Sequence, residues 1–351
     1  MKETIYVVDD NDTNLLSAKD ALKDYYRVIT LSSAAKMFAL MDKIPPDLIL
    51  LDIEMPEMDG FKVLRRLKTN DLYAHIPVMF LTNVTDASVE ARGFKLGVVD
   101  FITKPFSTPV LLNRIRTHLH IDELIRERMA QIQRLKNAIV FSFADIVEKR
   151  DYDTGGHVER TSAYISILVN AMISRGVHDD ELRHMDIDSF ISSARLHDVG
   201  KIAIPDKILN KPGRLNDEEF ETMKTHSTEG EKIIAQIASR ADDDDFLRNA
   251  MLFAGYHHER WDGTGYPYGL KKTKIPLQGR IMAVADVYDA LVSERPYKKP
   301  FTEEEANNII MDSAGKHFDP YIVDVFYEVK DQFSAVKQSH TSRIMELIAE
   351  E

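Results

Sequence analysis

Leu48-Ile49-Leu50-Leu51-Asp52 decides the fold of the first domain, because four apolar residues there end in a carboxylate. Two other short apolar runs, at residues 5–8 and 78–81, also end in polar side chains. Such runs are typical of strands that are buried on both faces. The amphipathic stretches at residues 14–25 and 33–43 lie between the runs and predict helices. Strands that alternate with helices predict a doubly wound α/β domain with a parallel sheet.

Polar residues follow each of these apolar runs. Ligands of doubly wound sheets bind beyond the carboxyl ends of the strands. Five polar residues are therefore expected at this edge of the sheet: Asp9, Asp10, Asp52, Thr82 and Lys104. Clustered carboxylates repel one another unless a cation joins them, so Mg²⁺ is the expected occupant. A carboxylate beside a divalent cation can accept a phosphoryl group, and lysine and threonine can sense the added charge.

These residues resemble the receiver domain of bacterial response regulators over residues 1–122. The motifs that carry the resemblance are Val8-Asp9-Asp10, Leu51-Asp52 with Met55-Pro56-Glu57-Met58-Asp59-Gly60, Leu81-Thr82 and Thr103-Lys104-Pro105-Phe106. The resemblance implies that Asp52 is the phosphoacceptor and that it holds Mg²⁺ together with Asp9 and Asp10. It also implies a switch made of Thr82, Phe101 and Lys104, and a cognate sensor histidine kinase as partner.

Length and composition narrow the class of protein. A chain of 351 residues predicts two or three domains. The net charge of -12 argues against nucleic-acid binding, so no direct DNA binding is expected. The chain has no cysteine, which excludes disulfides and argues against a structural zinc site. Neither a signal peptide nor a membrane-spanning run is visible, and we expect a cytoplasmic protein without membrane insertion.

Residues 109–150 form a charged stretch without glycine, which predicts one long helix. Apolar residues recur along it at intervals of three and four: Ile125, Met129, Ile132, Leu135 and Ile139. This spacing places an apolar stripe along one side of the helix. The stripe could pack on the domains of its own chain, or it could pair with its twin in a homodimer through a coiled coil. Under either interpretation, residues 123–148 are a helical linker.

The second half of the chain predicts an all-α helical bundle. Helices are expected at residues 162–172, 187–196, 217–236, 246–256, 280–293 and 303–313. Seven candidate metal ligands follow one another in this half: His157, His197, Asp198, His226, His257, His258 and Asp286. Imidazoles with carboxylates suit iron, manganese, nickel, cobalt or zinc, and such sets often hold a metal pair that acts on phosphate. Asp198 is the expected bridge, since its two oxygens can reach two cations.

This half resembles the HD-GYP family of HD phosphohydrolases over residues 149–330. The motifs are Thr154-Gly155-Gly156-His157, His197-Asp198-Val199-Gly200-Lys201, Met223-Lys224-Thr225-His226, His257-His258-Glu259, Asp262-Gly263-Thr264-Gly265-Tyr266-Pro267, Ala285-Asp286-Val287-Tyr288-Asp289-Ala290, and the stretch from Arg295-Pro296-Tyr297-Lys298 to Phe318-Asp319-Pro320. The resemblance implies a phosphodiesterase that opens cyclic di-GMP to pGpG or GMP, with iron or manganese as the foremost metals.

Several further residues are assigned roles toward the substrate or a third metal. The resemblance implies that Arg295 and Lys298 hold the second phosphate of the dinucleotide, and that Tyr266 turns an aromatic face to the site or the core. Relatives with three metals carry glutamate four residues before the first histidine. This chain has Asp153 there, so the number of metals, two or three, stays open.

Lys201 is the expected catalytic cation beside Asp198. It follows His197 by four residues, so it would lie on the same side of a helix that continued through both. A lysine in that place would stabilise negative charge that develops on the phosphate oxygens.

The leading hypothesis is a two-component response regulator in which phosphorylation of Asp52 controls hydrolysis of cyclic di-GMP. Two alternatives stay open: a hydrolase of a different cyclic dinucleotide, and a slow or inactive metal-containing sensor that acts through protein contacts. Residues 331–351 are expected to form a helical tail.

Overall fold

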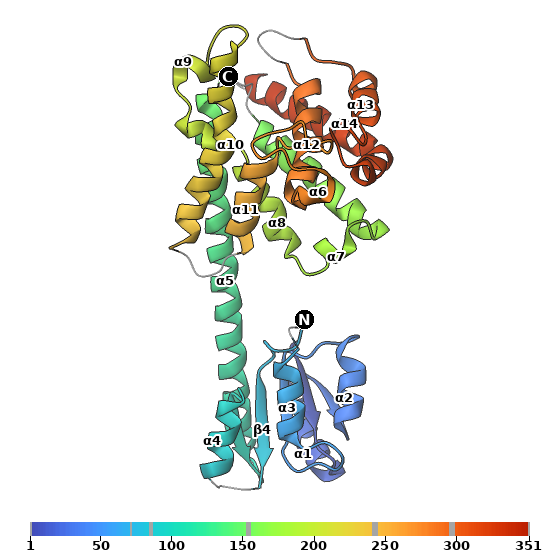
Figure 1. The fold of residues 1–351 in the computed structure, drawn as a ribbon. Coiled ribbons are helices and arrows are strands. Elements are labelled where there is room, and N and C mark those ends of the chain that lie inside the picture. Colours follow the sequence, from blue (N-terminus) through green and yellow to red (C-terminus); the bar gives the residue numbers. More distant parts are fainter. Residues whose placement is uncertain are drawn as a thin grey trace. The chain divides into compact units, whose positions relative to one another are not determined.

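A computed structural model describes residues 2–70, 72–83, 87–151, 156–240, 245–294 and 299–349, with side chains described as far as residue 339. The chain divides into two compact units, Met1–Gln133 and Arg134–Glu351. One long helix, α5 (Thr108–Arg150), belongs to both units and is continuous over 43 residues, as the connector sequence predicts (Figure 1).

The first unit is a doubly wound α/β domain, which confirms the expected fold. All five strands are parallel and stand in the order β2-β1-β3-β4-β5; they are β1 (Thr4–Val8), β2 (Arg27–Leu31), β3 (Leu48–Asp52), β4 (Val78–Thr82) and β5 (Asp100–Thr103). The sheet is covered by α1 (Asp12–Leu22), α2 (Ala34–Met41), α3 (Gly60–Lys68), α4 (Ala87–Lys95) and the start of α5.

Two of these strands were not expected from the sequence. The edge strand β2 buries only its last residue, Leu31, so it lacks the continuous apolar run of a central strand. The other missed strand, β5, has only four residues, and just Phe101 and Ile102 within it are buried. Both strands are too short or too polar for their apolar pattern to stand out from that of a loop.

The sheet separates two hydrophobic cores. Successive residues of a strand point to opposite faces. Val7 and Leu50 therefore pack with α1 and with Leu111 of α5, whereas Val8 and Leu51 pack with α2 and α3. The parallel register pairs Asp52 with Leu81 and Thr82 with Thr103, which brings the polar ends of the strands to one edge of the sheet.

The second unit is helical, as expected. After α5 it contains α6 (His157–Arg175), α7 (Asp179–Leu182), α8 (Ile187–Ser193), the 3-10 helices η1 (Ala194–Leu196) and η2 (Val199–Ala203), α9 (Asp206–Leu209), α10 (Asp217–Ala238), α11 (Asp245–Tyr256), η3 (Lys272–Lys274), α12 (Leu277–Val292), α13 (Glu303–Asp312) and α14 (Pro320–Ala349). None of the described helices is long and apolar enough to cross a membrane.

The main core of this unit joins α6, α12 and α14 (Figure 1). Its centre is aromatic: the Tyr164 ring stacks on Phe333 with 4.5 Å between ring centres, and Tyr288 meets Phe333 edge to face at 5.1 Å. Phe333 is fully buried. The boundary expected at residue 330 therefore lies within α14, and the start of the expected tail is part of the core.

Candidate metal centre

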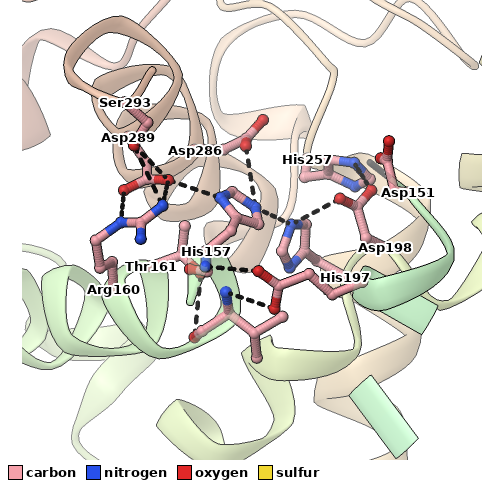
Figure 2. Close-up of polar contacts among 12 residues, drawn as sticks. Asp151, His157, Arg160, Thr161, His197, Asp198, His257, Asp286, Asp289 and Ser293 are labelled. Atoms are coloured by element: carbon pink, nitrogen blue, oxygen red, sulfur yellow. Dashed lines mark hydrogen bonds and ion pairs between the residues drawn. The ribbon is translucent and has the colours of Figure 1, made fainter. Parts of the chain in front are cut away.

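Three segments far apart in the chain bring one group of candidate ligands together. His157 begins α6, His197 follows η1, and Asp286 lies on α12. The Nε2 atom of His157 is 3.3 Å from Nε2 of His197 and 3.6 Å from Oδ1 of Asp286. Asp198 completes the group, with its Oδ2 3.4 Å from Nε2 of His197 (Figure 2).

The second group lies on the other side of Asp198. Nε2 of His226, on α10, is 3.2 Å from Nε2 of His257, which follows α11. Oδ1 of Asp198 is 3.5 Å from the His226 atom and 3.7 Å from the His257 atom. The His258 ring is centred 4.0 Å from the His257 ring. Asp198 thus turns Oδ2 toward the first group and Oδ1 toward the second. A carboxylate that bridges two cations needs this position.

The histidine rings are fixed from behind through their Nδ1 atoms. His197 bonds the carbonyl of Ala194 at 3.1 Å, His226 that of Met223 at 2.7 Å, and His257 that of Phe253 at 3.0 Å. A carbonyl oxygen only accepts, so these Nδ1 atoms carry the protons, and a neutral ring then presents a lone pair at Nε2. Lone pairs that face each other at these short distances repel unless a cation lies against them. The donor set therefore fits metal ions.

A carboxylate that the sequence analysis did not assign orients His157. Asp289 accepts from Nδ1 of His157 at 2.8 Å and from Nε of Arg160 at 2.7 Å, and it is almost fully buried (Figure 2). Burial alone would raise the pKa of Asp289, but the bonds from Arg160 and His157 lower it to about 2. Its position three residues after Asp286, on the same helix, is the sequence signal that could have identified it.

The ionisation of most of the candidate ligands suits metal binding. Burial lowers the pKa of His226, takes that of His257 to about 3 and holds that of His258 well below its usual range, so these rings stay neutral. Burial alone would raise the pKa of Asp198, but the neighbouring charge of Lys201 keeps it well below normal. His157 differs: the carboxylates around it outweigh burial and raise its pKa to about 9.

The helical premise for Lys201 was wrong, although the residue does lie beside Asp198. No helix runs from His197 to Lys201, because η1 ends at Leu196 and a new 3-10 helix starts at Val199. Gly200 packs directly on α10, and an added Cβ would lie 1.9 Å from the carbonyl oxygen of His226. The turn brings Nζ of Lys201 within 2.9 Å of Oδ2 of Asp198.

Residues at the end of α5 also reach the centre, and no local sequence signal marked them. Asp151 pairs with Nζ of Lys201 at 2.8 Å. Glu148 accepts from the backbone N–H of His157 at 2.7 Å, so it caps the first turn of α6, which starts five residues before the helix predicted at residue 162. Arg150 donates to the backbone carbonyls of Lys201, Ile202 and Ile204.

The loop after His258 is shaped by its own backbone contacts. Glu259 is buried and accepts from the N–H groups of Tyr268 and Leu270 at 2.7 and 2.9 Å. At Gly265 a Cβ would lie 2.5 Å from the carbonyl oxygen of His258, so only glycine fits there. The Tyr266 ring lies 4.7 Å from the His258 ring. The predicted residues Asp153, Arg295 and Lys298 lie outside the described residues.

The carboxyl-terminal edge of the parallel sheet brings together the predicted acidic residues. Asp9 and Asp52 are buried whereas Asp10 is exposed, and the three carboxylates lie close enough to share one cation. Nζ of Lys104 is 2.6 Å from Oδ2 of Asp9 and 2.8 Å from Oδ1 of Asp52. Burial raises the pKa of Asp52 although Lys104 opposes that rise. Asn14, which the sequence analysis did not single out, donates to Asp9 at 3.1 Å.

The two other predicted switch residues, Thr82 and Phe101, are both buried. The Phe101 ring packs edge to face on Phe80 at 5.6 Å and on Phe94 at 5.2 Å. At Gly93 an added Cβ would lie 2.4 Å from the Phe101 ring, so α4 approaches this aromatic residue closely.

Known proteins match both units. A family model described as the HD domain matches residues 142–322, and one described as the response regulator receiver domain matches residues 5–116. A Vibrio cholerae protein named "Probable cyclic di-GMP phosphodiesterase" is 39% identical over 350 residues, which cover 95% of this chain and 79% of that protein. The Xanthomonas campestris "Cyclic di-GMP phosphodiesterase response regulator RpfG" is 34% identical over 83% of this chain and 77% of its own length. The V. cholerae "3'3'-cGAMP-specific phosphodiesterase 2" is 37% identical over 60% of this chain and 38% of its own length.

Proposed function

This chain belongs to the response regulators that join a receiver domain to an HD domain, the cyclic di-GMP phosphodiesterase family, and from that premise we propose that it hydrolyses cyclic di-GMP at a metal centre. The proposed products are the linear dinucleotide pGpG, GMP or both. The observation that carries the proposal is the position of Asp198 between two groups of histidines whose Nε2 atoms converge on its oxygens.

The two groups supply ligands for two ions. His157, His197 and Asp286 would hold one ion, and His226, His257 and His258 the other, with Asp198 shared. Two transition-metal ions held there, iron or manganese foremost, would supply Lewis acidity toward the phosphate and an activated water. If the centre holds a third ion, Asp153 is its candidate ligand.

Lys201 is the proposed catalytic cation. Two carboxylates, Asp198 and Asp151, hold its ammonium group at 2.9 and 2.8 Å. Their charges outweigh burial and raise the pKa of Lys201, so it stays protonated. A fixed positive charge at the edge of the metal centre would stabilise the negative charge that develops on the phosphate oxygens during attack.

Control by phosphorylation of Asp52, with Mg²⁺ held by Asp9, Asp10 and Asp52, is part of the proposal. A phosphoryl group would add negative charge where Lys104 now pairs with two carboxylates, so it would change the partners of that lysine. Helix α5 leaves the receiver, and Glu148 and Arg150 in its last turn, with Asp151 just after it, contact residues of the candidate metal centre. These contacts support α5 as the element that transmits the change.

We also propose that α5 pairs with its twin in a homodimer. Isoleucine recurs every seven residues along α5, at Ile125, Ile132, Ile139 and Ile146, and each of these side chains is more than half exposed. β-branched residues that recur every seven positions supply one of the two apolar positions of a coiled-coil heptad.

Metal analysis combined with product chromatography tests the proposed metal-dependent hydrolysis of cyclic di-GMP. The wild-type protein should take up two or more iron or manganese ions per chain and convert cyclic di-GMP to pGpG or GMP. His257→Ala should lose metal and turnover together, because it removes a ligand from the second group. His184→Ala, at an exposed histidine, is the matched control and should keep both. Full activity in H257A would refute the site.

A second substrate is favoured by the likeness to the 3'3'-cGAMP-specific phosphodiesterase. Turnover measured side by side on cyclic di-GMP and 3'3'-cGAMP separates the two. Preference for cyclic di-GMP is the expected result. Tight binding of either dinucleotide without turnover in any metal would instead support the sensor function.

A further inference from the structure

An exposed aromatic residue lies on α10 close to the metal centre. Phe220 precedes His226 by six residues, and about half of its side chain is exposed (48%). Leaving a large apolar ring in water forfeits the free energy of burying it, about 1.5–3 kcal/mol. Lys224 lies one helical turn after Phe220, so the two side chains share a face of α10.

Tyr266 joins this face to the metal centre. Its ring is centred 4.7 Å from the ring of the candidate ligand His258 and 6.4 Å from the ring of Phe220. The two aromatic rings are nearly perpendicular, at 81°. His258, Tyr266 and Phe220 thus form a continuous aromatic path that leads outward from the candidate ligands.

A positive charge lies between the two aromatic rings. Nζ of Lys224 is 5.4 Å from the centre of the Phe220 ring and 5.7 Å from the centre of the Tyr266 ring. Both distances are within the range of a cation–π interaction. The same Nζ atom is 2.5 Å from the carboxylate of Glu221, whose side chain is mostly exposed. The ammonium group is therefore held in place, and part of its surface faces solvent.

We propose that Phe220, Lys224 and Tyr266 form a base platform: one guanine of the cyclic dinucleotide stacks on the exposed Phe220 ring, with its edge toward the perpendicular Tyr266 ring, while its phosphate occupies the metal centre. The inference rests on the proposed function. Flat aromatic surfaces beside a phosphate site are the usual means of holding an unpaired base. Guanine presents O6 and N7 as acceptors on one edge, and Lys224 can donate to them.

The platform gives a reason for a ring that is exposed next to a catalytic centre. Only one sugar separates a base from its phosphate, so a base must find a surface close to the metal ions. Adenine carries an amino group where guanine has O6, and that amino group cannot accept from Lys224. The platform therefore favours guanine over adenine at this position.

The test compares Phe220→Ala, Phe220→Trp and Ile237→Ala in the full-length, metal-loaded protein. Ile237 is the matched control, because it is equally exposed (49%) at the far end of the same helix. The measurements are KM and kcat for cyclic di-GMP, and the Kd of its hydrolysis-resistant phosphorothioate analogue. Metal content and melting temperature are measured for each variant.

F220A should raise KM and Kd by about 5- to 150-fold, the range that base–aromatic stacking contributes. The effect should be larger on KM than on kcat, and F220W should restore most of the affinity because it keeps a flat ring. I237A should behave as the wild type. Lys224→Met should weaken binding of the cyclic di-GMP analogue more than binding of the corresponding cyclic di-AMP analogue.

Three outcomes would overturn the platform: equal Kd for F220A and wild type, no rescue by F220W, or a loss of affinity that a fall in metal content accounts for. Cleavage of cyclic di-GMP by wild type with an unchanged Kd in F220A would refute the platform and leave the proposed function standing. Binding that depends on Phe220 without any cleavage would support the platform and refute the hydrolase. If the wild type neither binds nor cleaves, both are wrong.

Discussion

Asp289 shows how a residue outside the candidate ligand set can orient one of the candidate ligands. It holds the Nδ1 atom of His157 while Arg160 clamps both of its oxygens. A histidine ligand keeps its orientation and its tautomer through the partner on its other nitrogen. The orientation of His157 is therefore decided by Asp289 on α12, a residue 132 positions further along the chain.

Asp289→Asn should weaken metal binding by about 10- to 100-fold, because the amide keeps the shape but loses the charge that fixes His157. Manganese titration by equilibrium dialysis measures the change. Asp312→Asn, at an exposed aspartate, should leave the affinity unaltered. Circular dichroism would verify that the variant is folded, since Arg160 loses its charged partner. Wild-type metal affinity in folded D289N would contradict the role assigned to Asp289.

At the scale of elements, a partly buried ionic cluster joins three helices away from the candidate metal centre. His178, which precedes α7, lies 3.3 Å from Glu181 of α7 and 3.3 Å from Asp319, just before α14. Arg280 of α12 pairs with the same two carboxylates. Hydrogen bonds to Asp319 and Glu181 raise the pKa of His178 to about 9, against the opposing effects of burial and Arg280.

Stability of the helical unit should therefore fall with rising pH. An unfolded histidine has a pKa of about 6.5, so the folded state binds this proton more tightly. The stabilisation is fully present below about pH 6.5 and is lost as pH rises through about 9. His178→Gln should remove that part of the pH dependence, on the order of 1–3 kcal/mol. Chemical denaturation at pH 6.5 and 9.5 measures the unfolding free energy.

The comparison between variants isolates the effect of His178 from other groups that titrate in the same range. His184 is exposed, so His184→Gln should retain the wild-type difference between the two pH values. If H178Q and wild type lost the same stability between pH 6.5 and 9.5, the cluster would not be the source of the pH dependence.

At the scale of the whole molecule, α5 is the element shared by both units. Its apolar positions at 125, 132, 139 and 146 are exposed, and its last turn contacts residues of the metal centre. Pairing is therefore tested by substitutions on this helix, and regulation by a substitution at Asp52 in the receiver.

Ile132→Glu should convert a dimer to a monomer, because a charge in the seam of a coiled coil loses its solvation on pairing. Light scattering measures the mass of the particle. Arg134→Glu places the same charge outside the seam and should leave the dimer intact. A monomeric wild type, or a dimeric I132E, would refute pairing through α5.

Phosphorylation of Asp52 should change the rate of cyclic di-GMP hydrolysis. Acetyl phosphate with Mg²⁺ supplies the phosphoryl group, and turnover is measured before and after its addition. Asp52→Ala should be insensitive to the phosphodonor, because it lacks the accepting carboxylate. Equal activity of wild type and D52A, with and without the donor, would remove the regulatory proposal.

The order and spacing of residues within single segments were sufficient to predict much of the fold and to choose the candidate ligands. Strands with continuous apolar runs, such as β3, and helices with regular apolar spacing, such as α10, follow from the residues within each segment. The sequence also pointed to candidate metal ligands in the second domain, since imidazole and carboxylate groups together are a ligand mix that suits transition metals. These features depend on neighbours in the chain, and they can be read without knowing how the segments pack.

Only the tertiary structure decided which residues support the ligands and how Lys201 is placed. Asp151 meets Lys201 across 50 residues of chain, and Asp289 meets His157 across 132. Phe220 becomes a candidate base platform only because the loop carrying Tyr266 folds back against α10. Lys201 reaches Asp198 through a turn that Gly200 permits by packing on α10, not through a continued helix. Such contacts arise from the packing of distant segments, which local periodicity does not encode.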